Sequence, residues 1–185
     1  MNRIILASKS PRRKELLEQI GVDFIIDSID VEEVFDQALP FQEQIMEVAL
    51  SKATPIAKSN YDDIVIGADT MISINNIKLG KPKDKDEARR ILTMLSNKTH
   101  KVYTGVAICY QGQNLMFYEE TNVTFWDLTN EEIEVYLKTN EWQDKAGAYG
   151  IQGIGTKLVK SITGDYNNVV GLPVSKLIRI IEKLI

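Results

Sequence analysis

The stretch LASKSPRR, residues 6–13, constrains the fold of this chain more than any other part of the sequence. The apolar residues 4–6 before it predict a short buried strand. Residues 14–20 after it have an apolar face of helical period and are followed by a glycine, a common helix stop. Ser10 suits the N-cap position and Pro11 the first helical position. The sequence therefore predicts a strand–turn–helix junction with hydroxyl side chains in the turn.

The charge of this junction is unusual. Arg12, Arg13 and Lys14 fall in the first helical turn, where the helix dipole is already positive and a cation costs roughly 0.3–1 kcal/mol. Free backbone N–H groups at the same end of a helix favour an anion. Two interpretations follow: a binding site for a polyanion, or a basic turn whose side chains bend back into water.

Composition sets the broad class. The chain has 185 residues, of which 44% are hydrophobic and 26% charged, so we expect a single domain spanning residues 1–185. The net charge of −4 opposes a broad nucleic-acid-binding surface. A single cysteine, Cys109, excludes an internal disulfide and suits a reducing compartment, and a single histidine, His100, excludes a histidine-based metal cluster. With no visible signal peptide or membrane-spanning run, we expect a cytoplasmic protein that does not bind membranes.

The pattern of apolar residues predicts alternating strands and helices. Short apolar or alternating runs predict further strands at residues 24–26, 64–66, 101–110, 115–126 and 158–162, and a hairpin over residues 71–79. Amphipathic runs predict further helices at residues 42–59, 84–95 and 129–137, and from residue 173 onward, with a polar loop over residues 163–168. The fold class is therefore α/β with a mixed sheet flanked by helices.

Acidic residues form the first candidate site. Asp69 and Thr70 follow the predicted strand 64–66, and binding sites of α/β proteins gather at the carboxyl ends of strands. A carboxylate there could orient a water molecule or bind a cation, or it could be an ordinary polar strand end. A glutamate from the acidic stretch 27–40, Glu32 or Glu33, could join Asp69 around magnesium, which commonly takes one or two carboxylates plus substrate phosphates. The alternative is a solvated acidic loop.

Two lysines and a glutamine complete the candidates. Lys52 lies on or beside the apolar face of the helix 42–59, where it could contact a phosphate or simply extend its ammonium to water. Lys81 lies in a loop between a glycine and a proline, where it could be held over a site. Gln152 lies in the glycine-rich stretch 145–153 and offers both a donor and an acceptor, which suits the edge of a nucleobase. A glycine-rich loop alone is weak evidence for such a site.

Taken together, five blocks of this sequence resemble the Maf family of nucleoside triphosphate pyrophosphatases, also called septum formation inhibitors. The blocks occur in family order over essentially the full length, at residues 6–13, 67–70, 80–82, 145–153 and 164–173. The resemblance implies an elongated α/β fold of the Maf and ITPase type, with two lobes and a central cleft, and commonly a homodimer. It also implies hydrolysis between the α- and β-phosphates, which yields a nucleoside monophosphate and pyrophosphate and requires a divalent cation, magnesium or manganese.

The resemblance further assigns roles to individual residues. Asp69 would accept a proton from the attacking water and, with Glu33, bind the metal. The phosphates would be held by Ser8, Arg13, Lys52 and Lys81. Arg12, Thr70 and Gln152 match positions that separate subgroups by base preference, and this set resembles the subgroup that acts on dTTP, UTP and modified uridine triphosphates. Such an enzyme would cleanse the nucleotide pool.

Two competing classes of function stay open on the sequence. A non-catalytic nucleotide sensor that regulates cell division would use the same basic turn but would not need the chemistry of Asp69. An RNA-binding module is the second, and the acidic charge balance disfavours it.

Overall fold

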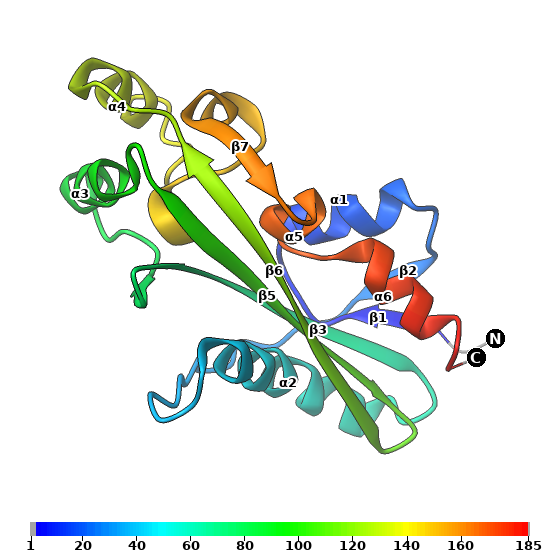
Figure 1. The fold of residues 1–185 in the computed structure, drawn as a ribbon. Coiled ribbons are helices and arrows are strands. Elements are labelled where there is room, and N and C mark those ends of the chain that lie inside the picture. The colour runs from blue at the N-terminus through cyan, green and yellow to red at the C-terminus, as the bar shows by residue number, and fades with distance from the viewer. Residues whose placement is uncertain (1–2, 185) are drawn as a thin grey trace. The chain divides into compact units, whose positions relative to one another are not determined.

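The computed structural model describes residues 3–184, which form a seven-stranded sheet flanked by helices (Figure 1). The strand order is β2-β1-β3-β5-β6-β7, with β4 beside β3. The strands are β1 (Ile4–Leu6), β2 (Phe24–Ile26), β3 (Ile64–Ile74), β4 (Ile77–Leu79), β5 (Thr99–Tyr110), β6 (Gln113–Phe125) and β7 (Val159–Thr163). The helices are α1 (Pro11–Gln19), α2 (Phe41–Ser59), α3 (Lys85–Leu95), α4 (Asn130–Leu137), α5 (Tyr166–Val170) and α6 (Val174–Ile181), with two 3₁₀ helices, η1 (Ala146–Ala148) and η2 (Gly153–Leu158).

The sheet is mixed. β1 pairs in parallel with both β2 and β3, whereas β4 and β7 pair antiparallel with β3 and β6. The predicted α/β class with a mixed, helix-flanked sheet is therefore confirmed. No helix among residues 3–184 is both long and apolar enough to cross a membrane.

The described chain divides into two compact units. The first comprises residues 3–70, 103–119 and 171–184, and the second comprises residues 71–102 and 120–170. Strands β3, β5 and β6 contribute residues to both units. The expected central cleft between two lobes stays a prediction.

The core of the first unit lies between its strands and α2. Ile5 of β1 and Val65 of β3 are fully buried and pack with Ala49 and Ala53 of α2. α1 and α6 lie on the opposite side of these strands (Figure 1). The predicted junction of strand, turn and helix at residues 4–19 is present, with Ser10 at the N-cap position and a proline at the start of α1.

β3 is longer than the sequence analysis predicted. The expected strand 64–66 continues without a break to Ile74, so the expectation that Asp69 and Thr70 follow its end is wrong. A Cβ atom on Gly67 would lie only 2.2 Å from the carbonyl oxygen of Ala49, so this glycine lets the backbone of α2 approach the strand.

The second unit confirms the predicted hairpin 71–79 and the predicted helices 84–95 and 129–137. The hairpin of β3 and β4 turns at Asn75 and Asn76, which both have positive φ angles. Thr129 caps α4 in a complete capping box with Glu132. Asp84 caps α3 by accepting a hydrogen bond from the backbone of Glu87.

One loop prediction in the second unit is wrong. The expected polar loop covered residues 163–168, but residues 166–168 belong to the short helix α5 (Tyr166–Val170). The side chain of Asp165 accepts a hydrogen bond from the backbone N–H of Asn167 at 2.8 Å, as a cap does. Asn168 is fully buried and donates to the backbone of Val102 and to the hydroxyl of Thr121. The polar residues that suggested a loop therefore cap this helix and tie it to the sheet.

Candidate active site

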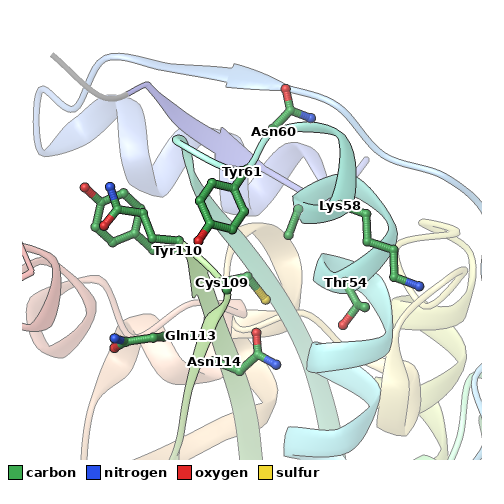
Figure 2. Close-up of a pocket in the computed structure, with 11 residues that line it drawn as sticks. Thr54, Lys58, Asn60, Tyr61, Cys109, Tyr110, Gln113 and Asn114 are labelled. Carbon is green, nitrogen blue, oxygen red and sulfur yellow. The ribbon is translucent and has the colours of Figure 1, made fainter.

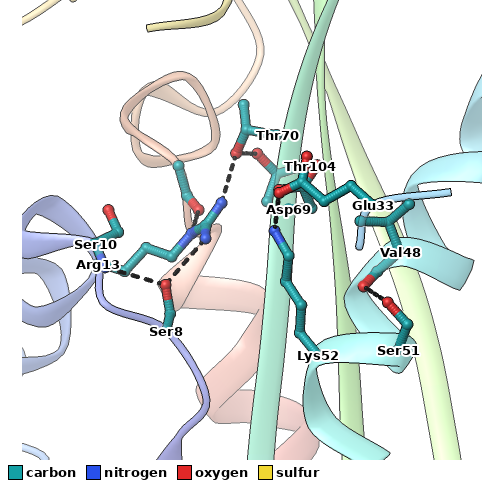
Figure 3. Close-up of polar contacts among 11 residues, drawn as sticks. Ser8, Ser10, Arg13, Glu33, Val48, Ser51, Lys52, Asp69, Thr70 and Thr104 are labelled. Carbon is teal, nitrogen blue, oxygen red and sulfur yellow. Dashed lines mark hydrogen bonds and ion pairs between the residues drawn. The ribbon is translucent and has the colours of Figure 1, made fainter. Parts of the chain in front are cut away.

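Arg13 is the most constrained side chain of the first unit. It lies in the first turn of α1, turns inward and is only 9% exposed. Its Nε donates to the carbonyl oxygen of Gly171 at 2.8 Å, Nη1 donates to the Ser8 hydroxyl at 3.1 Å, and Nη2 donates to the Thr70 hydroxyl at 3.2 Å (Figure 3). Three segments that are distant in sequence therefore hold one guanidinium group.

All three acceptors of Arg13 are neutral. Within residues 3–184, no carboxylate lies within ion-pair distance of this guanidinium. Burial lowers the pKa of Arg13, while the more distant negative charge of Asp69 opposes that shift. An arginine has five N–H donors and stays charged in proteins. Two N–H donors of Arg13 are therefore left for an anion, and no carboxylate of residues 3–184 pairs directly with its positive charge.

The other cations of this turn are placed differently. Lys14 pairs with Glu18 along α1, with an Nζ–Oε1 distance of 3.5 Å. Arg12 is half-buried. Ser10 makes no side-chain capping bond, so its hydroxyl leaves the first N–H groups of α1 uncapped. The expected cluster of three cations therefore reduces to one inward-turned arginine at an uncapped helix terminus.

A second group of charges lies on α2, β3 and the acidic loop. The Lys52 ammonium donates to Asp69 Oδ1 at 2.6 Å and to Glu33 Oε1 at 2.7 Å (Figure 3). Asp69 is 9% exposed. The lysine comes from α2 and the aspartate from β3, which the close approach at Gly67 brings together. The structure thus joins three of the predicted residues in one ion-paired cluster.

Threonine hydroxyls lie beside both groups. Thr70, next to Asp69 in β3, accepts from Arg13, and its hydroxyl lies 2.9 Å from that of Thr104 in β5. Thr104 is fully buried. The sequence analysis missed Thr104 and the Gly171 carbonyl. A polar residue inside the apolar run 102–109 was the one available signal for Thr104.

The carboxylates of Glu33 and Asp69 suit a hard cation. Both contact one positive group, Lys52 Nζ, so their oxygens already converge on a common point. Residues 3–184 hold no group of three or more His, Cys, Asp or Glu side chains that could form a protein-only metal cage. Two carboxylates completed by ligand oxygens are the set that magnesium commonly uses. The residues present therefore fit a cation that is shared with a bound phosphate.

The remaining predicted residues belong to the second unit. Lys81 is exposed in the loop between β4 and α3, and Gln152 is exposed just before η2. The backbone N–H of Gly147 donates to the carbonyl oxygen of Gly80 at 3.1 Å. The loop of Lys81 and the glycine-rich segment of Gln152 are therefore bonded to each other within this unit.

The first unit also contains a cavity of about 170 Å³, at the end of α2 and the turn between β5 and β6 (Figure 2). Tyr61, Cys109 and Asn114 are among its lining residues. None of the predicted site residues lines it. Burial raises the pKa of the Cys109 thiol, so this cysteine is not activated as a nucleophile. The candidate active site therefore remains with the charged residues of β3, α1 and α2.

This chain is similar to known proteins both in sequence and in fold. A family model described as Maf-like protein matches residues 3–184. The dTTP/UTP pyrophosphatase of Bacillus anthracis is 52% identical over 179 residues, which cover 97% of this chain and 94% of that relative. The dTTP/UTP pyrophosphatase of Bacillus cereus strain ZK / E33L is also 52% identical, with the same coverage. A solved HAM1 protein from Coxiella burnetii has a TM-score of 0.51 at 18% identity over 68% of this chain and 73% of that chain, which is a likeness of fold alone.

Proposed function

The chain belongs to the Maf family, and from this membership we propose that it is a nucleoside triphosphate pyrophosphatase that acts on dTTP and UTP. The reaction adds water to the α–β phosphoanhydride and releases the nucleoside monophosphate and pyrophosphate. Two relatives at 52% identity carry the name of this activity, which supports the proposal. Modified uridine triphosphates are further proposed substrates, in keeping with a role in cleansing the nucleotide pool.

One observation carries the proposal: the buried Arg13 guanidinium has only neutral partners. Burying a charge without a counterion is costly. An anionic ligand bound at the guanidinium would offset this cost, and guanidinium groups hydrogen-bond well to phosphate oxygens. The N–H groups at the start of α1 would add to the same anion site. We therefore assign the phosphate chain to Arg13, Ser8 and the first turn of α1.

Asp69 is the proposed proton acceptor. Its Oδ1 is held by the ammonium of Lys52, so the carboxylate is fixed in the same unit as the phosphate site. During attack, the water oxygen bonds to phosphorus, its proton passes to the Asp69 carboxylate, and the bond to the leaving pyrophosphate breaks. Lys52 would stabilise charge on the phosphoryl oxygens, because phosphoryl transfer is catalysed mainly by positioning and electrostatics. Lys81 is proposed as a further phosphate contact.

Glu33 and Asp69 are the residues that would hold magnesium or manganese. The bound cation would neutralise negative charge on the phosphate oxygens. Arg12, Thr70 and Gln152 are the proposed determinants of base preference. A homodimer in the cytoplasm, with no nucleic acid or membrane bound, completes the proposal; sedimentation of the purified protein measures the oligomeric state.

A nucleotide panel tests the proposed function. The purified protein is incubated with dTTP, UTP, GTP and ATP and magnesium, and monophosphate and pyrophosphate are quantified. We expect equal amounts of both products from dTTP and UTP. Asp69→Asn should bind nucleotide yet lose roughly 10²–10⁴-fold in turnover, the usual contribution of a general base. Asp62→Asn, an exposed aspartate of the same unit, is the matched control.

The panel also separates the alternative functions. Tight nucleotide binding without turnover would instead support the non-catalytic sensor. Turnover that is unchanged in Asp69→Asn at saturating metal would remove Asp69 from the mechanism. Release of orthophosphate in place of pyrophosphate would refute cleavage at the α–β bond.

A further inference from the structure

Glu141 binds the backbone of the segment that follows Gln152. Its Oε1 and Oε2 accept from the N–H of Ile154 at 3.2 and 3.1 Å, and Oε2 also accepts from the N–H of Gly155 at 3.2 Å. All these residues belong to the second unit. A carboxylate that accepts backbone N–H groups makes charge-assisted hydrogen bonds, which are roughly twice as strong as neutral ones. The Glu141 carboxylate therefore anchors the backbone of the turn that follows Gln152.

Two glycines make this anchoring possible. Gly153 has a φ of +66°, and a Cβ atom there would lie 2.9 Å from Glu141 Oε1. A Cβ atom on Gly155 would lie 2.1 Å from the carbonyl oxygen of Gly150. The segment 150–155 thus folds back on itself against the carboxylate. Gln152 is exposed within this closed turn.

Glu141 is itself held in place. Its backbone N–H donates to the Thr139 hydroxyl at 3.1 Å, and its carbonyl oxygen accepts from the ammonium of Lys145. The neighbouring Trp142 is buried and donates its indole N–H to the carbonyl oxygen of Leu137 at 3.2 Å. The carboxylate therefore projects from a fixed backbone and not from a free loop.

We propose that Glu141 is the residue that positions Gln152 for recognition of the pyrimidine base. The proposal rests on the proposed function, in which Gln152 contacts the base. An amide that donates to a carbonyl and accepts from N3–H must be oriented closely, since recognition tolerates errors of only about 0.5 Å. Both carboxylate oxygens of Glu141 accept hydrogen bonds from the turn, so Glu141 would act on the base through Gln152. It is therefore a positioning residue and not a catalytic one.

A double-mutant cycle tests this role. Glu141→Gln is nearly isosteric but replaces one acceptor oxygen by an amide N–H₂ group. We expect it to raise KM for dTTP and UTP about tenfold, the range for losing a hydrogen bond to a charged group, with kcat changed less than threefold. In a Gln152→Ala background, the same substitution should change KM less than twofold, because the group being positioned is absent. Glu131→Gln, an exposed glutamate of α4, is the control and should match wild type.

A second measurement reads the anchor without activity. Hydrogen exchange at the amides of Ile154 and Gly155 should be faster in Glu141→Gln than in wild type, and unchanged in Glu131→Gln. Equal effects of Glu141→Gln with and without Gln152 would overturn the positioning role, as would unaltered exchange at both amides. If the wild type hydrolyses no nucleotide at all, the proposed function itself fails, and the positioning role fails with it.

Discussion

At the scale of single residues, Arg13 shows a conflict between folding and binding. Its charge is buried among neutral acceptors, which costs stability unless an anion is bound. A ligand that binds only the folded state stabilises it by an amount that rises with the logarithm of the ligand concentration above Kd. Pyrophosphate should therefore raise the Tm of the wild-type protein through this residue.

Removing the Arg13 guanidinium should weaken both capture and turnover of the triphosphate. We expect Arg13→Ala to lower kcat/KM for dTTP by roughly 10²-fold or more, because each charge-assisted hydrogen bond contributes about 1.5–3 kcal/mol. Arg13→Lys should recover only part, since an ammonium lacks the planar fork that reaches several acceptors at once. Arg13→Ala should also abolish most of the increase in Tm that pyrophosphate causes in the wild type.

The matched control is Lys14→Ala, which removes an exposed cation of the same helical turn that pairs with Glu18. Steady-state kinetics on dTTP and UTP compare the three variants. If Lys14→Ala loses as much kcat/KM as Arg13→Ala, then general positive charge and not the buried guanidinium captures the phosphates.

The base preference is argued at the same scale. Gln152→Glu replaces an amide that can donate and accept by a carboxylate that only accepts at pH 7. A pyrimidine carbonyl would then face a negative charge, and a mispaired polar group costs about 1–3 kcal/mol. We expect kcat/KM to fall roughly 5- to 100-fold for dTTP and UTP but less for GTP, whose N1–H and N2–H are donors. An equal loss on all three nucleotides would mean that Gln152 supports its loop and does not contact the base.

At the scale of elements, the approach of α2 to the sheet places the charged cluster. Gly67 in β3 lies against Ala49 and Ala53, and Gly105 in β5 lies against the backbone of Ile45. Without Cβ atoms at these positions, α2 comes close enough for Lys52 to reach the carboxylate two residues beyond Gly67. The packing of α2 against the sheet therefore also fixes the distance between Lys52 and Asp69.

Gly67→Ala should disturb both properties together. The added Cβ atom would lie 2.2 Å from a backbone oxygen, so α2 must shift as a whole. Overpacking of this kind typically costs about 1–3 kcal/mol. Urea unfolding should show this loss, and turnover should fall because the distance between Lys52 and Asp69 changes. Gly80→Ala has open space around it and should leave the free energy of unfolding nearly unchanged.

At the scale of the whole molecule, one buried histidine contributes to the variation of stability with pH. His100 is 1% exposed, its Nε2 lies 2.7 Å from the Tyr149 hydroxyl, and its ring packs edge-on against Phe125 and Tyr149. Desolvation lowers its pKa from 6.5 to about 4. The unfolded chain therefore binds a proton between these two pH values that the folded chain does not.

Because the folded chain keeps His100 neutral, His100 favours the folded state more at neutral pH than in acid. The contribution of neutral His100 is complete above pH 6.5 and is lost as the pH falls from 6.5 toward 4. Over that window the free energy of unfolding should decline by up to roughly 3 kcal/mol. His100→Gln should flatten the slope between pH 4.5 and 6.5, whatever its effect on stability at pH 7. Urea denaturation at four pH values measures it, and an unchanged slope in His100→Gln would exclude this histidine as the cause.

Local sequence signals were sufficient to predict most of the helices and strands and most of the candidate residues. Turn and cap signals act over a few residues, so the junction before α1, the turn at Asn75–Asn76 and the capping box at Thr129 were predictable. The alternation of predicted strands and helices indicated a mixed α/β fold. Arg13, Lys52 and Asp69 were candidates from their residue types and positions, whereas Ser8 was a candidate only through the resemblance to the Maf family.

Which side chains contact each other depends on long-range packing, which no local sequence pattern encodes. Arg13 bonds the carbonyl of a residue 158 positions away, and a backbone carbonyl leaves no trace in a sequence pattern. The Glu141 carboxylate fits against the segment 150–155 because Gly153 has no Cβ atom in its way. Gly67 lay at the expected end of a strand, and only the position of α2 shows that this glycine permits close packing inside a longer strand. Long-range packing therefore determines the hydrogen-bond partners of Arg13, its burial, and the fact that all three of its acceptors are neutral.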